Sequence, residues 1–229
     1  YSSFVGPDDQ WLPPDHFQEE PRGEVARRTS PTNIGLLQLA TLSAHDLGHA
    51  GLLSVVLRLR NTFDTLERME RHRGHFYNWY DTRDLAPLSP RYVSTVDSGN
   101  LAACLLAVKQ GCFELAQAPV IGPARWDGLL DTLDVLLEVI ERRARPRGGA
   151  ARFAALRECV EKMREEAITL KGQRRAWGPS IARLLERGAT ELDQALLSVI
   201  AEGGEGLDPD LLSRSEEHTS ELQSPIHIS

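Results

Sequence analysis

The chain has 229 residues, 41% of them hydrophobic, so it is long enough to bury a core in one large domain or two small ones. Its formal net charge of −7 argues against nucleic acid as a partner, because nucleic-acid-binding proteins present a basic surface. Nowhere do about 18 apolar residues follow one another, as a membrane-spanning helix requires, so we expect a soluble chain that does not insert into a membrane.

The chain opens with an extended lead-in, residues 1–28, which is rich in proline, glycine and charge and has no sustained hydrophobic period. At Ser30 the pattern changes, because serine caps helices and Pro31 fits the first helical position. A first helix is predicted from here to Gly48, and a second over residues 52–72. The two helices are expected to pack as an antiparallel hairpin.

Residues 74–97 interrupt the helical pattern with Pro87, Pro90 and several aromatic residues. They are too irregular for a helix and too broken for a long strand, and they leave room for no more than a short β-hairpin. Loops of this length inside compact domains are often functional. A third helix is predicted from residue 97 to residue 116, and no convincing strand is found. Further helices are predicted over residues 126–145, 151–170 and 180–202, which makes the fold class all-α.

The aromatic and acidic residues of this loop suit a carbohydrate cleft. Aromatic rings stack on the apolar faces of a sugar, while carboxylates and amides bond to its hydroxyl groups. Glycosidic-bond chemistry also requires two carboxyl groups, and Asp81 and Asp97 are the local catalytic candidates. The predicted substrate-binding residues are Asn33, His75, Tyr77, Trp79, Tyr80, Tyr92 and Asn100.

Each of these residues also has a structural explanation. Asp97 stands where a helix begins and is also explained as an N-cap. Asp81 is also explained as the organiser of a turn. The aromatic residues between positions 77 and 80 would equally serve as packing, and Asn33 would equally lie on a helix surface. The composition of the loop leaves both explanations open.

Neither a metal nor a cofactor is predicted. His45 and His49 have helical spacing but lack the glutamate of an HExxH zinc site. The glycine-rich motifs that hold nucleotide phosphates are missing from the sequence.

Three stretches resemble cyclic β-1,2-glucan synthases: ARRTSPTNIGL (26–36), RHRGHFYNWYDTR (71–83) and PRYVSTVDSGNLA (90–102). WLPPDHFQEEP (11–21) fits upstream of them. The resemblance implies a fragment from the start of the central glucoamylase-like region, which cyclises linear β-1,2-glucan by transglycosylation. It also implies a parent glycosyltransferase in the bacterial inner membrane, with this region on the cytoplasmic side.

Relatives of that region form an (α/α)6 toroid. Residues 29–116, with the aromatic loop 74–97, would then be the first helices of an incomplete toroid, and residues 117–213 a helical extension or linker. The implied partners are β-1,2-glucan and the remaining domains of the same parent chain. The isolated fragment is expected to be inactive, because it supplies only part of the toroid. A non-catalytic helical scaffold between domains of a membrane glycosyltransferase is the alternative.

Residues 214–229 are expected to be an artefact. RSEEHTSELQS (214–224) resembles the translation of a sequencing adapter, so we exclude this end from the fold prediction.

Overall fold

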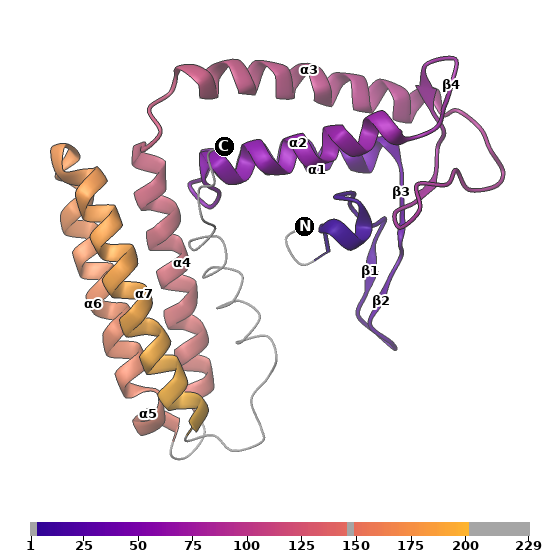
Figure 1. The fold of residues 1–229 in the computed structure, drawn as a ribbon. Coiled ribbons are helices and arrows are strands. Elements are labelled where there is room, and N and C mark those ends of the chain that lie inside the picture. Colours follow the sequence, from indigo (N-terminus) through magenta and orange to yellow (C-terminus); the bar gives the residue numbers. More distant parts are fainter. Residues whose placement is uncertain (1–3, 146–148, 202–229) are drawn as a thin grey trace. The chain divides into compact units, whose positions relative to one another are not determined.

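The computed structural model describes residues 4–145 and 149–201, and most of them are helical (Figure 1). The all-α prediction is therefore confirmed. The chain divides into two compact units, unit 1 up to Val120 and unit 2 from Ile121 onward. The expected artefact at 214–229 lies outside the described residues. No helix within the described ranges is long and apolar enough to cross a membrane.

Three long helices build unit 1, and α1 packs against both of the others. They are α1 (Pro31–Asp46), α2 (Leu52–Arg68) and α3 (Thr95–Gln117). Apolar side chains from all three helices meet in a buried cluster, with Leu42 from α1, Leu59 from α2 and Val108 from α3. A second cluster joins the helices to the segments before and after them, through the buried side chains of Leu12, Ile34, Leu66, Met69, Tyr80 and Leu101.

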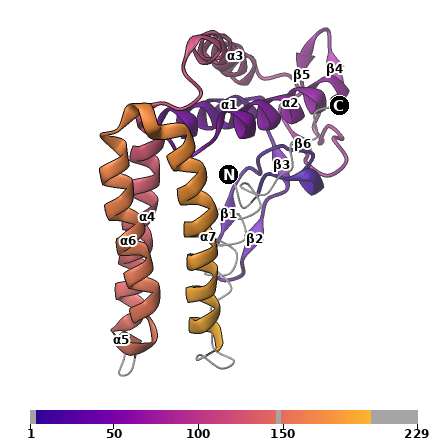
Figure 2. The ribbon, with the colours of Figure 1, turned by 60° about the vertical axis from the view of Figure 1, so that its left-hand side comes forward.

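Unit 1 also contains three short antiparallel strand pairs, whereas the sequence showed no convincing strand and left room only for a short β-hairpin in the loop (Figure 2). β1 (Phe17–Gln18) pairs with β2 (Glu24–Val25), β3 (Arg28–Thr29) with β6 (Tyr80–Asp81), and β4 (Arg71–His72) with β5 (His75–Phe76). Each strand has two residues, too few for an alternating pattern to show in the sequence. The β3–β6 pair ties the lead-in, which also carries the 3-10 turn η1 (Pro7–Asp9), to the aromatic loop.

The second helix ends at Arg68, four residues before the predicted end at His72. The chain there enters the β4–β5 hairpin, whose two turn residues, Arg73 and Gly74, have φ angles of 51° and 86°. Positive φ at both central positions is typical of a tight two-residue hairpin turn. Gly74 therefore marks a hairpin and not the end of the helix.

A close contact between α1 and α3 depends on Gly35. A Cβ atom at this position would lie 2.9 Å from Cys104 Cβ and 3.4 Å from Leu101 Cα. The backbone of α3 therefore lies against a surface of α1 that has no side chain.

Gly35→Val should destabilise unit 1 by about 2 kcal/mol, because the added side chain pushes the two helices apart. Gly99→Val is the matched control, since Gly99 also lies in a helix of unit 1 and a Cβ there would meet no atom within 4 Å. Hydrogen exchange of the backbone amides in α1 and α3 measures the stability of this part of unit 1 in both variants. Equal protection of these helices in the two variants would contradict the close contact.

Within residues 121–145 and 149–201, unit 2 consists of three long helices and two short ones. α4 (Pro123–Ala144), α6 (Ala154–Lys171) and α7 (Trp177–Ala201) are joined through α5 (Gly149–Arg152) and η2 (Arg174–Ala176). α6 packs against both α4 and α7. The buried side chains that they share are Leu133, Ile140, Phe153, Leu156, Val160, Met163 and Val199. These long helices correspond to the three predicted ones, although the last begins at Trp177 instead of Ser180.

Candidate functional site

The N-terminal ends of α1 and α3 lie next to each other in unit 1. Each is capped by a serine: Ser30 Oγ accepts a hydrogen bond from the Asn33 N–H (3.3 Å), and Ser94 Oγ accepts one from the Asp97 N–H (3.1 Å). The Thr32 hydroxyl on α1 donates to Asp97 Oδ1 on α3 over 2.7 Å and so joins the two ends. The positive ends of two helix dipoles are therefore brought together, an arrangement that favours negative charge.

Asp97 lies in the first turn of α3, and Ser94 fills the N-cap position, so the explanation of Asp97 as an N-cap is wrong. Asp97 Oδ2 accepts a second hydrogen bond, from the Ser94 hydroxyl (2.6 Å). Burial alone raises the pKa of Asp97, but the hydrogen bonds from Ser94 and Thr32 outweigh it, and the pKa is lowered. Asp97 is therefore ionised at neutral pH. An ionised carboxylate can accept hydrogen bonds or a proton, but it cannot act as the proton donor of a glycosidase.

The buried amide of Asn78 connects Asp97 to two aromatic residues. With its nitrogen toward Asp97, it donates to Oδ2 (2.9 Å), while its oxygen accepts from Trp79 Nε1 and from the Tyr92 hydroxyl, both at 2.7 Å. The reverse orientation sets the amide oxygen against the carboxylate and keeps only the bond to Tyr92. The first orientation satisfies every neighbour and is therefore the one we assign.

Three side chains form the exposed rim of this arrangement. Tyr92 is 47% exposed, Trp79 is half-buried, and Asn100 is exposed and donates from Nδ2 to Thr32 Oγ1 (3.1 Å). We call Thr32, Asn78, Trp79, Tyr92, Asp97 and Asn100 the Asp97 network. It presents an aromatic surface beside an anionic acceptor and an amide.

The lead-in closes one side of the Asp97 network. The guanidinium carbon of Arg28 lies 4.8 Å from the centre of the Trp79 ring, and Arg28 also donates to Asp15 Oδ2 from Nε (3.1 Å) and Nη2 (2.9 Å). Asp15 Oδ1 in turn accepts from Asn33 Nδ2 (3.4 Å). Asn33 therefore lies next to the network and bonds to the lead-in.

Asp81 has a separate set of partners. Arg83 binds its carboxylate through Nε (3.0 Å), Nη2 (2.6 Å) and the backbone N–H (2.9 Å). These hydrogen bonds from Arg83 are the main reason why the pKa of Asp81 is lowered. The contacts are those of a turn organiser, and a lowered pKa does not suit a general acid.

The remaining predicted residues differ in their access to a ligand. Tyr80 is 0% exposed, and its hydroxyl donates to the Glu70 carbonyl and accepts from the Tyr77 N–H, both at 2.7 Å. As placed here it cannot contact a sugar, so its predicted binding role is wrong and it serves as a core residue. Tyr77 is half-buried below Arg91, whose guanidinium carbon lies 5.8 Å from the ring centre. His75 is exposed on the β4–β5 hairpin.

Sequence reasoning missed Thr32, Asn78, Asp15 and Arg28. Thr32 follows a predicted cap and Asn78 stands inside the aromatic stretch, so the local sequence did place both near the site. No local pattern indicated Asp15 or Arg28, because the β3–β6 pair brings the lead-in to the loop across about 50 residues of chain.

Comparisons with known proteins agree with the resemblance noted above. No family model matches the chain. Over 141 residues, or 61% of its length, the chain is 46% identical to the cyclic β-(1,2)-glucan synthase NdvB of Rhizobium meliloti. The match covers 5% of that protein. The resemblance to cyclic β-1,2-glucan synthases is therefore confirmed, and it supports a fragment of such a synthase.

Proposed function

We propose that this segment of a cyclic β-1,2-glucan synthase binds β-1,2-glucan at the Asp97 network. The observation that carries the proposal is the hydrogen-bonded connection from ionised Asp97 through Asn78 to Trp79 and Tyr92. Exposed aromatic surface would stack on a glucosyl ring, while Asp97 and Asn100 would bond to its hydroxyl groups.

The proposed role of Asp97 is to accept hydrogen bonds and to stabilise positive charge. A glycosyl transfer passes through an oxocarbenium-like transition state, which a nearby carboxylate stabilises. The lowered pKa of Asp97 supports this role, since the residue carries its charge at neutral pH. Asp81 is not part of the proposed chemistry, because its carboxylate is bound by Arg83. The proton donor would come from another part of the parent enzyme.

In the parent enzyme, we place this segment in the region that cyclises linear β-1,2-glucan by transglycosylation, at the start of an (α/α)6 toroid on the cytoplasmic side of the inner membrane. Exposed apolar side chains on the outer faces of the helices support this placement, because further helices of a toroid would cover them. Leu53 and Val56 on α2 and Leu106 and Phe113 on α3 are each at least half exposed. The remaining domains of the parent chain would cover these faces, and the isolated segment would bind glucan without converting it.

Trp79→Ala should weaken binding of a linear β-1,2-gluco-oligosaccharide by about tenfold, because the stacking surface is removed. Isothermal titration calorimetry on the whole 229-residue chain measures the affinity. Phe113→Ala is the matched control: it removes an exposed ring of α3 outside the network, and wild-type affinity is expected. Equal affinities in all three proteins would overturn the proposed site.

The alternative function is a non-catalytic helical scaffold, and three observations favour it. Tyr80 belongs to the core, Arg83 holds Asp81 in a turn, and Asp97 has hydrogen-bond partners within the protein. Asp97→Asn in the full-length synthase separates the two functions. Unchanged cyclisation by a stably folded variant would favour the scaffold, and lost cyclisation with normal folding would favour glucan binding.

A further inference from the structure

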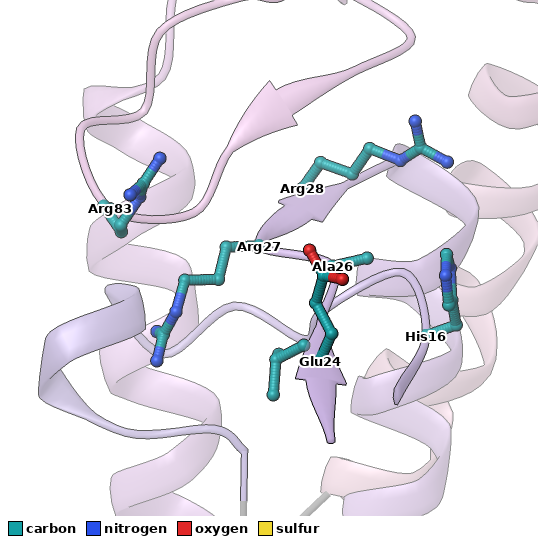
Figure 3. Close-up of a pocket in the computed structure, with 7 residues that line it drawn as sticks. His16, Glu24, Ala26, Arg27, Arg28 and Arg83 are labelled. Atoms are coloured by element: carbon teal, nitrogen blue, oxygen red, sulfur yellow. The ribbon is translucent and has the colours of Figure 1, made fainter. Parts of the chain in front are cut away.

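A shallow hollow of about 440 Å³ lies beside the lead-in strands of unit 1. Arg83 and Arg27 stand on one side of it and His16 and Arg28 on the other, with Glu24 between them (Figure 3). Its volume falls within the range of small-molecule sites, about 300–1,000 Å³. None of these residues was singled out as a binding residue from the sequence.

The charges around the hollow are balanced, although three arginines line it. Each arginine is paired with an aspartate: Arg27 with Asp9 at 2.7 Å, Arg28 with Asp15 at 2.9 Å, and Arg83 with Asp81 at 2.6 Å. Glu24 adds a further carboxylate. The guanidinium groups are already neutralised by carboxylates, so the hollow does not favour a phosphate. Paired donors and acceptors suit a neutral ligand with many hydroxyl groups.

The hollow adjoins the Asp97 network through Arg28. Arg28 lines the hollow, and its guanidinium carbon lies 4.8 Å from the Trp79 ring centre. His16 and Arg28 also share Asp15 with Asn33 of α1. A polymer bound at Trp79 would therefore reach the hollow by continuing past Arg28.

We propose that this hollow is a second glucan subsite, which holds sugar units that continue from those at Trp79. The inference rests on the proposed function and extends it to a longer ligand. His16 and Glu24 would contact the sugar directly, since both side chains are exposed at the hollow and neither lies in the core. Arg27 and Arg83 would bind the sugar through guanidinium N–H groups that their aspartate partners do not use.

The double variant His16→Ala/Glu24→Ala tests the subsite with little risk to the fold. Calorimetry on the whole chain compares a β-1,2-linked glucose disaccharide with a longer linear β-1,2-gluco-oligosaccharide. We expect the variant to lose about tenfold in affinity for the longer ligand, as two hydrogen-bonding side chains are removed, and to bind the disaccharide as the wild type does. Arg60→Ala on α2, where the side chain is 73% exposed, should change neither affinity.

The outcomes of this experiment distinguish an error in the subsite from an error in the proposed function. If wild type and double variant bind the longer ligand equally, the subsite is wrong while the Trp79 site stands. The same holds if the wild type gains no affinity with ligand length. If the wild type binds neither ligand, the proposed function and the subsite are both wrong.

Discussion

Tyr80→Ala should destabilise unit 1 by about 4 kcal/mol, the range for removing a buried aromatic ring from a core. The Tyr80 ring packs in the cluster that also contains Leu12, Ile34 and Leu101, so it joins the lead-in, α1 and α3. Its loss would leave a cavity where these three parts of unit 1 meet. Hydrogen exchange followed segment by segment measures the effect, with the helices of unit 2 as an internal reference that should keep wild-type protection.

Tyr80→Phe separates the hydroxyl from the ring. This variant leaves the Glu70 carbonyl and the Tyr77 N–H without the partner they have in the wild type, and we expect a smaller loss of about 2 kcal/mol. Equal protection of unit 1 in the wild type and in both variants would show that Tyr80 is not a buried core residue.

Burial raises the pKa of Tyr80 from 10.0 to about 12. The unfolded chain therefore ionises this phenol first, and the stability associated with neutral Tyr80 is full below pH 10 and lost as the pH rises toward 12. Ultraviolet absorbance of the phenolate should show Tyr80 ionising near pH 12, as a difference between wild type and Tyr80→Phe that appears as the pH approaches that value.

The helices of unit 1 could be predicted because their signals are local. Ser30 and Pro31 mark the start of α1, and apolar spacing continues through it. The end of α2 was misplaced because the sequence after Arg68 keeps no strong stop signal before Gly74. The strands were missed because each has two residues and depends on a partner elsewhere in the chain.

The candidate site was predictable in composition but not in detail. The sequence places aromatic and acidic residues on one loop, yet it does not say which ring turns inward. Trp79 and Tyr80 are neighbours, yet Trp79 is half-buried, whereas Tyr80 in β6 is fully buried. Asp81 and Asp97 differ in how far along the chain their partners lie. Arg83 is a local partner of Asp81, whereas Thr32 is a distant partner of Asp97.

Asp97→Ala should destabilise unit 1 by about 3 kcal/mol. The change removes an ionised acceptor from the hydroxyls of Thr32 and Ser94 and leaves the buried Asn78 amide without its carboxylate partner. The ends of α1 and α3 would then lose the Thr32–Asp97 hydrogen bond and would keep only the exposed one from Asn100 to Thr32. Hydrogen exchange should show increased exchange at these two helix ends first, with the helices of unit 2 again as the reference.

The pH dependence separates the charge of Asp97 from its shape. Because folding lowers the pKa of Asp97 below the ordinary value of 3.8, its contribution is full above that value and is lost as the pH falls through the lowered pKa. Asp97→Asn keeps the shape without a titrating group, so its stability deficit relative to wild type should be largest at neutral pH and should shrink in acid. A deficit that stays constant down to pH values well below 3.8 would mean that the Asp97 charge does not hold the two helix ends together. Glucan affinity measured over the same range adds a second readout, because an anionic acceptor that binds sugar hydroxyls loses strength as it is protonated.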